Sequence, residues 1–246
     1  MKGVCSVAEE FDEKACSYET NRLADWYRFQ GEEILKVLAP SLDGVILDIG
    51  CGTGWLLRQI LKTRPRLEGI GIDVSGRMID VARQKASEER LANVRFVKGD
   101  WESQNLSEIG INLDARPVRV VVCVSAFHYF AHPSLAARKI CRCLDAEGQF
   151  FLLDRAKERS LLTTFWDYLH RTLIRDHVRF YRETELCQLL KDAGFAEVQM
   201  VSRIEKYLWK GKLYTSLILL SARKQARHGS ASALMPERER EPLTVH

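Results

Sequence analysis

The chain has 246 residues, of which 46% are hydrophobic, so it can form one well-packed α/β domain with additions, or two small ones. Its formal net charge of +4 is modest and indicates no particular partner. No apolar stretch approaches the roughly 20 residues of a membrane span, and the acidic N-terminus lacks the apolar segment of a signal peptide. The seven cysteines are scattered and odd in number, so we expect reduced thiols in a cytoplasmic protein, without a metal site.

The N-terminal segment, residues 1–40, is predicted to be helical. Apolar side chains recur mostly at three- and four-residue steps from about Phe11 to Leu38. Pro40 and the turn at Asp43 and Gly44 end this segment before the first strand.

A glycine-rich loop follows the first predicted strand. Residues 45–49 form a short apolar run that includes Asp48, and the next residues are Gly50, Cys51, Gly52, Thr53 and Gly54. Glycines let a backbone turn sharply and bring its amides close to a ligand. The Asp48 carboxylate can accept hydrogen bonds from a ligand's ammonium group or hold the loop itself. The sequence therefore predicts a nucleotide-type cradle in this loop.

The residue after this loop decides which kind of nucleotide site is expected. A dinucleotide fingerprint requires its third glycine at position 55, where this chain has Trp55. A phosphate-binding P-loop requires Lys-Ser or Lys-Thr after the last glycine, and neither pair is present. The pattern D-x-G-x-G-x-G from Asp48 to Gly54 instead resembles the motif of class I S-adenosylmethionine-dependent methyltransferases.

This resemblance implies a three-layer α/β fold of the Rossmann-like kind. Its doubly wound sheet has seven strands, mostly parallel, with an antiparallel last strand. The implied methyltransferase domain spans residues 41–224 and binds S-adenosylmethionine through the loop residues Asp48, Gly50, Cys51, Gly52 and Gly54. The resemblance also implies that the helical segment 1–40 covers the bound cofactor. Its pattern from Phe11 to Tyr18 resembles family members in which the tyrosine lies against the cofactor; plain helix packing is the alternative for Tyr18.

The second predicted strand, residues 69–73, ends in Asp73, about 20 residues past the loop, where an acid is placed to hold ribose hydroxyls. A role for Asp73 as helix N-cap is the alternative, but Ser75 already serves that purpose. The resemblance also places Val74 at the cofactor, and Met78, one helical turn later, near the adenine.

The third predicted strand, residues 94–97, leads to Asp100 and Trp101. In the family, an aspartate here accepts a hydrogen bond from the exocyclic amine of adenine, and the next residue packs on the ring. Asp100 suits the first task by its charge, and Trp101 offers an aromatic face for the second. A loop anchor is the alternative for Trp101.

The run Pro117–Val124 is the richest in β-branched residues and is predicted to be the central strand. The resemblance places Ser125, Phe127 and His128, which follow it, beside the sulfonium, with Ser125 in contact with the cofactor. Histidine is the side chain best suited to exchange a proton near neutral pH, so His128 is the candidate general base; a structural or substrate-positioning histidine is the alternative. Poorly acidic hydroxyl and C–H acceptors require a base, whereas a carboxylate requires none.

The remaining chain is predicted to contain a helix from Pro133 to Leu144, a strand at 149–154, a helix at 184–193 and strands at 197–204 and 214–222. Residues 155–181 form an aromatic-rich insert on the substrate side, with seven basic and three acidic side chains from Arg155 to Arg182. This insert is either a substrate-recognition element, favouring an anionic acceptor, or a surface helix. Residues 225–246 are predicted to be a disordered tail.

Together these features predict an S-adenosylmethionine-dependent methyltransferase that acts on a small molecule and gives S-adenosylhomocysteine. Nucleic acid is disfavoured as a partner, because no Asn/Asp-Pro-Pro-aromatic tetrad follows the fourth strand and basic residues are spread thinly. Two alternatives stay open: a non-catalytic, cofactor-binding partner subunit of another methyltransferase, and an RNA-modifying methyltransferase. The sequence does not indicate an oligomeric state.

Overall fold

The fold is described from a computed structural model of the chain. The structure describes residues 4–21, 24–39, 42–109, 111, 116–156, 180–204, 207–209, 212–214 and 216–224. Most of the predicted insert at 155–181 and the whole predicted tail at 225–246 lie outside the described residues. The predictions made for these two segments therefore stay predictions.

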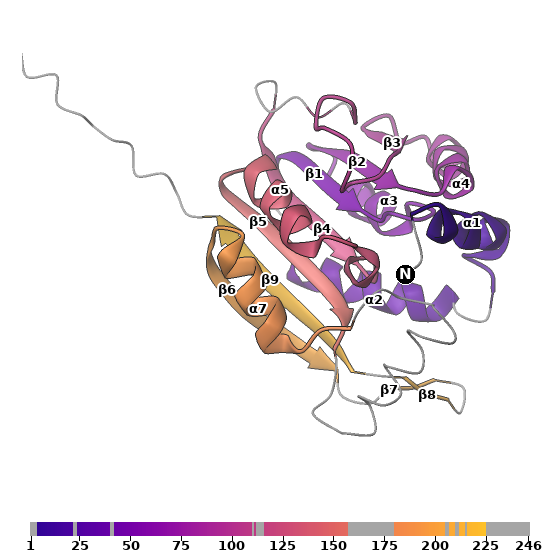
Figure 1. The fold of residues 1–246 in the computed structure, drawn as a ribbon. Helices are drawn as coiled ribbons and strands as arrows, with labels where there is room; N and C mark the ends of the chain where they lie inside the picture. The colour runs from indigo at the N-terminus through magenta and orange to yellow at the C-terminus, as the bar shows by residue number, and fades with distance from the viewer. Residues whose placement is uncertain are drawn as a thin grey trace, which may run out of the picture.

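A seven-stranded sheet with strand order β3-β2-β1-β4-β5-β9-β6 forms the centre of the molecule (Figure 1). Strands β1 to β5 pair in parallel, and β9 is antiparallel to both of its neighbours. This confirms the predicted doubly wound sheet with an antiparallel last strand. The strands of the sheet are β1 (Gly44–Ile49), β2 (Leu67–Asp73), β3 (Val94–Lys98), β4 (Val118–Val124), β5 (Leu144–Arg155), β6 (Phe195–Ile204) and β9 (Leu217–Lys224).

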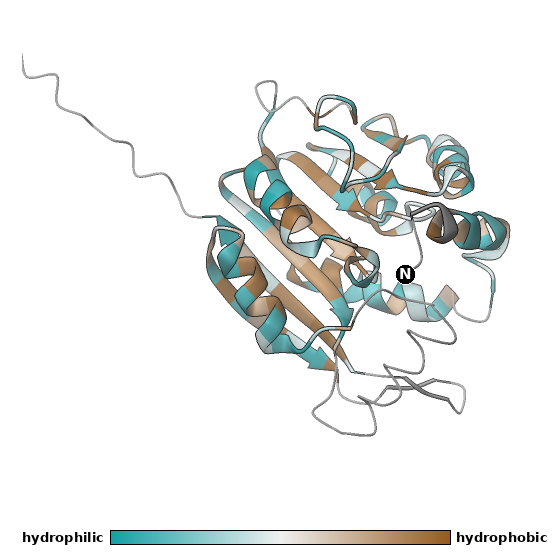
Figure 2. Cartoon of the chain, viewed as in Figure 1, coloured by the Kyte–Doolittle hydropathy of each residue, from teal (hydrophilic) through white to brown (hydrophobic). Residues whose placement is uncertain are grey.

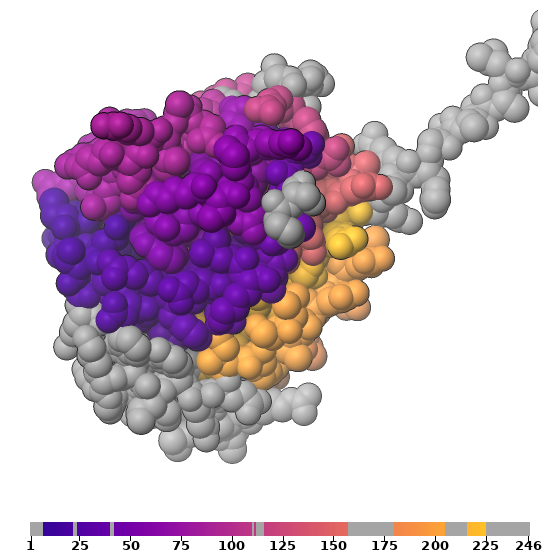
Figure 3. Space-filling view, turned by 180° about the vertical axis from the view of Figure 1, so that it is seen from behind, coloured from indigo at the N-terminus to yellow at the C-terminus, as the bar shows by residue number. Residues whose placement is uncertain are grey.

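Helices cover both faces of the sheet, which gives three layers. The helical elements are α1 (Val4–Lys14), η1 (Ala15–Ser17), α2 (Ala24–Val37), α3 (Trp55–Thr63), α4 (Gly76–Glu88), η2 (Phe127–Tyr129), α5 (Pro133–Cys143) and α7 (Glu183–Asp192). Figure 3 shows one face from behind, covered by the indigo and purple residues of the first part of the chain. None of the helices in the described part of the chain is long and apolar enough to cross a membrane.

The core lies in two layers, one on each side of the sheet. Leu47 packs with α5 and α7 in one cluster, whereas its neighbour Ile46 packs with α2 and α3 in the other. This alternation follows from the two-residue repeat of a strand. A parallel sheet buried on both faces needs nearly continuous apolar strands, which Figure 2 shows as the brown centre of the molecule.

The segment predicted to be helical from about Phe11 to Leu38 is helical but interrupted. The segment forms α1, which begins at Val4, then η1 and a turn, and then α2. The Ser17 carbonyl accepts hydrogen bonds from the amides of Thr20 (3.0 Å) and Asn21 (2.7 Å), which close the turn in place of a continuing helical ladder. The apolar period continues across this break, because both helices pack on the same domain.

Two predicted boundaries near the C-terminus also differ. Strand β5 begins at Leu144, whereas the predicted strand begins at residue 149. Leu144 pairs with Val118 and Gln149 pairs with Val120, so the register of the two strands shifts across residues 145–148. Strands β6 and β9 are neighbours as predicted, but a separate ladder of β7 (Tyr207–Trp209) and β8 (Lys212–Tyr214) lies between them in the chain.

Close packing at Gly71 in β2 predicts a large loss of stability on adding one methyl group. A Cβ there would lie 2.5 Å from a Phe96 ring carbon and 2.8 Å from the Cys51 sulfur. We expect Gly71→Ala to lower the free energy of unfolding by about 1–3 kcal/mol, the usual cost of overpacking. Urea denaturation measures this loss.

Gly76 in the first turn of α4 provides the matched control. A Cβ at Gly76 meets nothing closer than 3.5 Å, and that atom belongs to the flexible Lys98 side chain. We expect Gly76→Ala to be neutral or stabilising by up to about 1 kcal/mol. Equal stabilities for the two variants would contradict the packing described for β2.

Candidate active site

Polar side chains gather where the carboxyl ends of the central strands meet. Asp48, Asp73 and Asp154 lie at the ends of β1, β2 and β5, and Ser125 follows β4 directly. The chain winds outward in one direction from β1 and in the other from β4, so the edge between them is a topological switch point. Ligands of doubly wound sheets bind at this position.

The glycine loop between β1 and α3 has a backbone that only glycine adopts easily. Gly50, Gly52 and Gly54 have φ angles of 74°, 53° and 71°. A Cβ on Gly50 would lie 2.3 Å from the Cβ of Ala126, so a side chain there would push the loop from the end of β4. The amides of Gly50 (2.8 Å) and Cys51 (3.0 Å) both donate to the Ile72 carbonyl, which fixes the loop against β2.

Asp73 ties this loop to the start of α4. Its carboxylate accepts hydrogen bonds from the Gly52 amide at 2.8 Å and the Ser75 amide at 2.9 Å. Burial raises the pKa of Asp73, and these hydrogen bonds oppose that rise. The Ser75 hydroxyl accepts from the Met78 amide at 3.1 Å, so Ser75 is the N-cap of α4, as predicted. The Asp73 carboxylate keeps further acceptor positions for a ligand.

A large cavity extends from Asp73 to the loop after β3. It encloses about 1080 Å³ including its open mouth. Its walls come from the ends of four strands and from the N-terminal helices. The lining residues are Val7, Phe11, Tyr18, Ile49, Gly50, Gly52, Ile72, Asp73, Val74, Gly99, Asp100, Trp101, Glu102, Val124, Ser125, Ala126, Tyr129, Phe130 and Ala131.

Trp101, at the far end of this cavity, is both a wall and an anchor. Its side chain is 2% exposed, and its indole N–H donates to the Ala136 carbonyl at 3.3 Å. The Lys139 ammonium lies 4.3 Å from the centre of the Trp101 ring and donates to the Trp101 carbonyl at 2.6 Å. Asp100 beside it accepts from the Glu102 amide at 3.0 Å. Both side chains are therefore held in fixed positions at the cavity wall.

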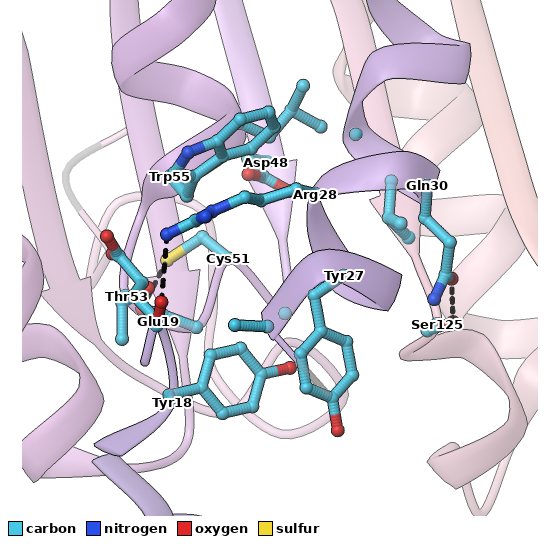
Figure 4. A pocket seen from close by; sticks show the side chains of 16 residues that line it. Tyr18, Glu19, Tyr27, Arg28, Gln30, Asp48, Cys51, Thr53, Trp55 and Ser125 are labelled. Carbon is cyan, nitrogen blue, oxygen red and sulfur yellow. Dashed lines mark hydrogen bonds between the residues drawn. The ribbon is translucent and has the colours of Figure 1, made fainter. Parts of the chain in front are cut away.

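A smaller cavity shares the glycine loop with the large one, because Gly50 and Gly52 line both (Figure 4). Asp48 lines it with 2% of its surface exposed, and among the described residues its carboxylate accepts no hydrogen bond. Burial and the nearby charge of Asp73 raise the pKa of Asp48 to about 7. Arg28 from α2 lines the same cavity and donates to the Glu19 carbonyl at 2.8 Å. The buried carboxyl group of Asp48 and the guanidinium cation of Arg28 thus line the same cavity.

Aromatic rings close the N-terminal side of both cavities. The Tyr18 ring stacks on Tyr27 with centroids 4.3 Å apart, and Phe11 lies edge-on to Tyr129 at 5.7 Å. Burial raises the pKa of Tyr18 well above its usual range. Asp12 fastens α1 in place, because its carboxylate accepts from the Ser75 hydroxyl at 2.5 Å and the Arg77 amide at 3.0 Å. These hydrogen bonds lower the pKa of Asp12.

The structure brings most of the predicted cofactor residues to these two cavities. Those that line at least one cavity are Tyr18, Asp48, Gly50, Cys51, Gly52, Asp73, Val74, Asp100, Trp101 and Ser125. Gly54 and Met78 line neither. Gly54 is the N-cap of α3, and a Cβ on Gly54 would lie 2.4 Å from the Phe96 ring. Met78 lies in the first turn of α4 and is buried. Met78 therefore has a packing role here, and its predicted place near an adenine is not seen.

His128 in η2 is buried beside the large cavity rather than in its lining. Its Nδ1 lies 2.7 Å from Asp154 Oδ1, and its ring centroid lies 4.2 Å from that of Tyr129, which lines the cavity. Phe127 points into the core with no exposed surface, so its predicted place at the reaction centre is not seen.

Sequence reasoning missed Gln30 and Arg28 of α2 as cavity residues. Gln30 has no exposed surface, and its side-chain oxygen accepts a hydrogen bond from the Ser125 hydroxyl. Ser125 needs this support because its φ of 50° is strained for a residue other than glycine. A glutamine on the apolar side of a helix was the available sequence signal. Arg28 carried none, because a basic residue on a half-exposed helix is common.

The pKa of Asp48 predicts how stability depends on pH. The folded state keeps the Asp48 proton up to about pH 7, whereas the unfolded chain loses it near 4, so this group stabilises the fold at low pH and that contribution is lost as pH rises to 7. We expect Asp48→Asn to gain up to about 4 kcal/mol relative to wild type between these pH values, and no more above them. Urea denaturation at a series of pH values measures the difference; a difference independent of pH would contradict the buried carboxylate.

Known proteins share both the sequence and the fold of this chain. A model of the methyltransferase domain family matches residues 11–200. The uncharacterized methyltransferase YcgJ of Bacillus subtilis is 33% identical over 155 residues, which cover 61% of this chain and 57% of YcgJ. The malonyl-[acyl-carrier protein] O-methyltransferase of Halalkalibacterium halodurans is 33% identical over 103 residues, which cover 42% of this chain and 36% of that protein. The chain thus matches less than two thirds of the length of either relative.

The crystal structure of YcgJ from Bacillus subtilis has a TM-score of 0.66 to this chain at 22% identity, covering 80% of this chain and 99% of that chain. This likeness shows the fold. The family match extends from α1 into β6, over more than half of the chain. The resemblance carried by the glycine loop is confirmed, and the chain belongs to the methyltransferase domain family.

Proposed function

We propose that the protein is an S-adenosylmethionine-dependent methyltransferase that methylates a small molecule and gives S-adenosylhomocysteine. The observation that carries this proposal is the pair of cavities that meet at the glycine loop, which offers separate partners for each part of the cofactor. The match to the methyltransferase domain family supports it.

The smaller cavity fits the amino-acid end of the cofactor. A zwitterionic amino acid needs an anion for its ammonium and a cation for its carboxylate. Asp48 is a buried carboxylate without a hydrogen-bond partner among the described residues, and Arg28 lies in the same cavity. A buried, unpaired carboxylate is costly, and an ammonium group of the ligand would satisfy it.

The larger cavity fits the nucleoside end. Asp73 has free acceptor positions for two ribose hydroxyls, and Asp100 and Trp101 stand at the far wall, where an adenine amine and ring would lie. Gly52 offers room for close approach, because a Cβ there would meet only a Tyr18 ring carbon at 3.8 Å. The residues present therefore fit the cofactor along its whole length.

The bound cofactor supplies a methyl group on a positively charged sulfur, which is already activated for displacement. The protein's contribution is to align the acceptor with that methyl group and to exclude water. Gly50 and Ser125 lie where the two cavities meet, and the rings of Tyr18, Tyr27 and Tyr129 enclose this space. His128 stands behind Tyr129 as the residue that holds or moves a proton.

A small-molecule acceptor fits this enclosed site better than a nucleic acid does. The relative from Halalkalibacterium halodurans is named for a malonyl group on an acyl-carrier protein, which supports a small acyl group or metabolite as the acceptor rather than a nucleic acid. The basic residues that favour an anionic acceptor lie mostly outside the described residues, so this preference is part of the proposal. The ordered histidine and aspartate favour an active enzyme over a non-catalytic partner subunit.

Calorimetric titration with S-adenosylhomocysteine tests the cofactor. We expect binding to the wild type and an affinity at least about 10-fold weaker for Asp73→Asn, because one charge-assisted hydrogen bond contributes about 1.5–3 kcal/mol. Asp80→Asn is the matched control, since Asp80 lies on the exposed side of α4 with 76% of its side chain accessible. Preference for NAD, or equal affinities for the two variants, would rule out the proposed site.

A further inference from the structure

A buried histidine and aspartate form a close pair outside the cofactor cavities. The side chains of His128 and Asp154 are 5% and 3% exposed, and Nδ1 of His128 lies 2.7 Å from Oδ1 of Asp154. The other carboxylate oxygen, Oδ2, accepts a hydrogen bond from the His128 amide at 3.0 Å. Both carboxylate oxygens of Asp154 thus contact His128, which fixes the position and the rotation of its imidazole ring.

This pair is built by the pairing of β4 with β5. Val124 and Leu153 are in register, so the residues that follow them, Ser125 and Asp154, lie side by side at the strand ends. The Ser125 amide donates to the Leu153 carbonyl at 2.8 Å and continues the ladder. The chain then turns through η2 and returns His128 onto Asp154.

The contact with Asp154 selects one form of the neutral ring. A carboxylate accepts hydrogen bonds, so Nδ1 carries the hydrogen and Nε2 carries a lone pair. Among the described residues, Nε2 has no hydrogen-bond partner. The pairing of Nδ1 with Asp154 leaves Nε2 as the ring nitrogen that can accept a proton. An unpaired Nε2 is what a general base requires.

The pair lies next to the place where the two cavities meet. Ala126, which precedes η2, and Tyr129, its last residue, line the large cavity, and the His128 ring lies 4.2 Å from the Tyr129 ring. On the other side, the Phe180 ring lies 5.7 Å away and carries the Arg155 guanidinium over its face. Within the described part of the chain, Cys123 on β4 and Tyr129 are further titratable groups beside the pair, and Asp154 is the acid that contacts the ring.

We propose that His128 and Asp154 act as a dyad that removes a proton from a hydroxyl-bearing acceptor, with Asp154 as the positioning residue. This inference rests on the proposed function and names its substrate class: a hydroxyl compound rather than a carboxylate. A carboxylate is already ionised near neutral pH and has no proton to give, so the dyad would be idle with such an acceptor.

The step balances as a displacement with one proton transfer. A lone pair of the hydroxyl oxygen forms the O–C bond to the methyl carbon, while the C–S bond breaks and its electrons stay on sulfur. The hydroxyl proton moves to Nε2 of His128. The resulting imidazolium is stabilised by the Asp154 carboxylate and later releases its proton to water.

Nitrogen-15 NMR of histidine-labelled protein tests the arrangement without any acceptor. We expect the neutral His128 ring to show a protonated Nδ1 and an unprotonated Nε2. In Asp154→Asn we expect this preference to weaken, because the amide can also donate. A wild-type ring with its hydrogen on Nε2 would overturn the proposal, since that nitrogen could not accept a proton.

Methyl-labelled S-adenosylmethionine and a metabolite extract identify the product class. A labelled methyl ether, stable to mild alkali, supports the dyad, whereas a labelled methyl ester, which releases methanol, overturns it. With the identified acceptor, we expect His128→Gln and Asp154→Asn each to lower kcat at least about 100-fold, the lower bound for general-base catalysis, with S-adenosylhomocysteine affinity unchanged. An unchanged kcat in His128→Gln would overturn the proposal.

Asp145→Asn is the matched control. It makes the same substitution at the opposite end of β5, where Asp145 forms an ion pair with Arg119 at 2.9 Å. We expect its kcat to equal that of the wild type. Failure to bind S-adenosylhomocysteine would refute the proposed function itself, whereas binding with the wrong tautomer or an ester product refutes only the dyad. If the extract yields no labelled product, the position of the ring hydrogen of His128 in the NMR experiment alone supports or overturns the dyad.

Discussion

The site depends most on the two hydrogen bonds that the Asp73 carboxylate accepts. One comes from the glycine loop after β1 and the other from the first turn of α4, so a single side chain fixes two chain segments from different βα units. Ser75 extends these contacts to α1, because its hydroxyl caps α4 and also donates a hydrogen bond to Asp12 of α1. These hydrogen bonds connect α1, which carries the Phe11 ring at the cavity, to the end of β2.

Two buried acids at the same edge make this arrangement costly. Burial raises the pKa of both Asp48 and Asp73, and the nearby charge of Asp73 raises the pKa of Asp48 further. A core built for stability alone would place apolar residues there. Acids that are kept at a thermodynamic cost, at the switch point of a sheet, indicate that the position is used for binding.

The features with a local signal could be predicted from the sequence. The apolar strands, the glycine loop and the acids at the strand ends repeat at short intervals, and the structure places ten of the twelve predicted cofactor residues on the two cavities. The pairing of His128 with Asp154 could not be predicted, because it depends on the register of β4 and β5 and on the turn of η2. The break after Ser17 was missed for a related reason, since the apolar period continues through it.

The order of strands in the sheet bears on how the protein is made. The strand latest in the chain among those described, β9, lies between β5 and β6 and pairs with both. Until residues 217–224 have left the ribosome, β5 lacks a partner along one side and β6 lacks its partner among the described strands altogether. Chains emerge at about 5–20 residues per second, and open strand edges invite pairing with other chains. The same strand that completes the sheet therefore also ends the period in which the nascent chain is most exposed to aggregation.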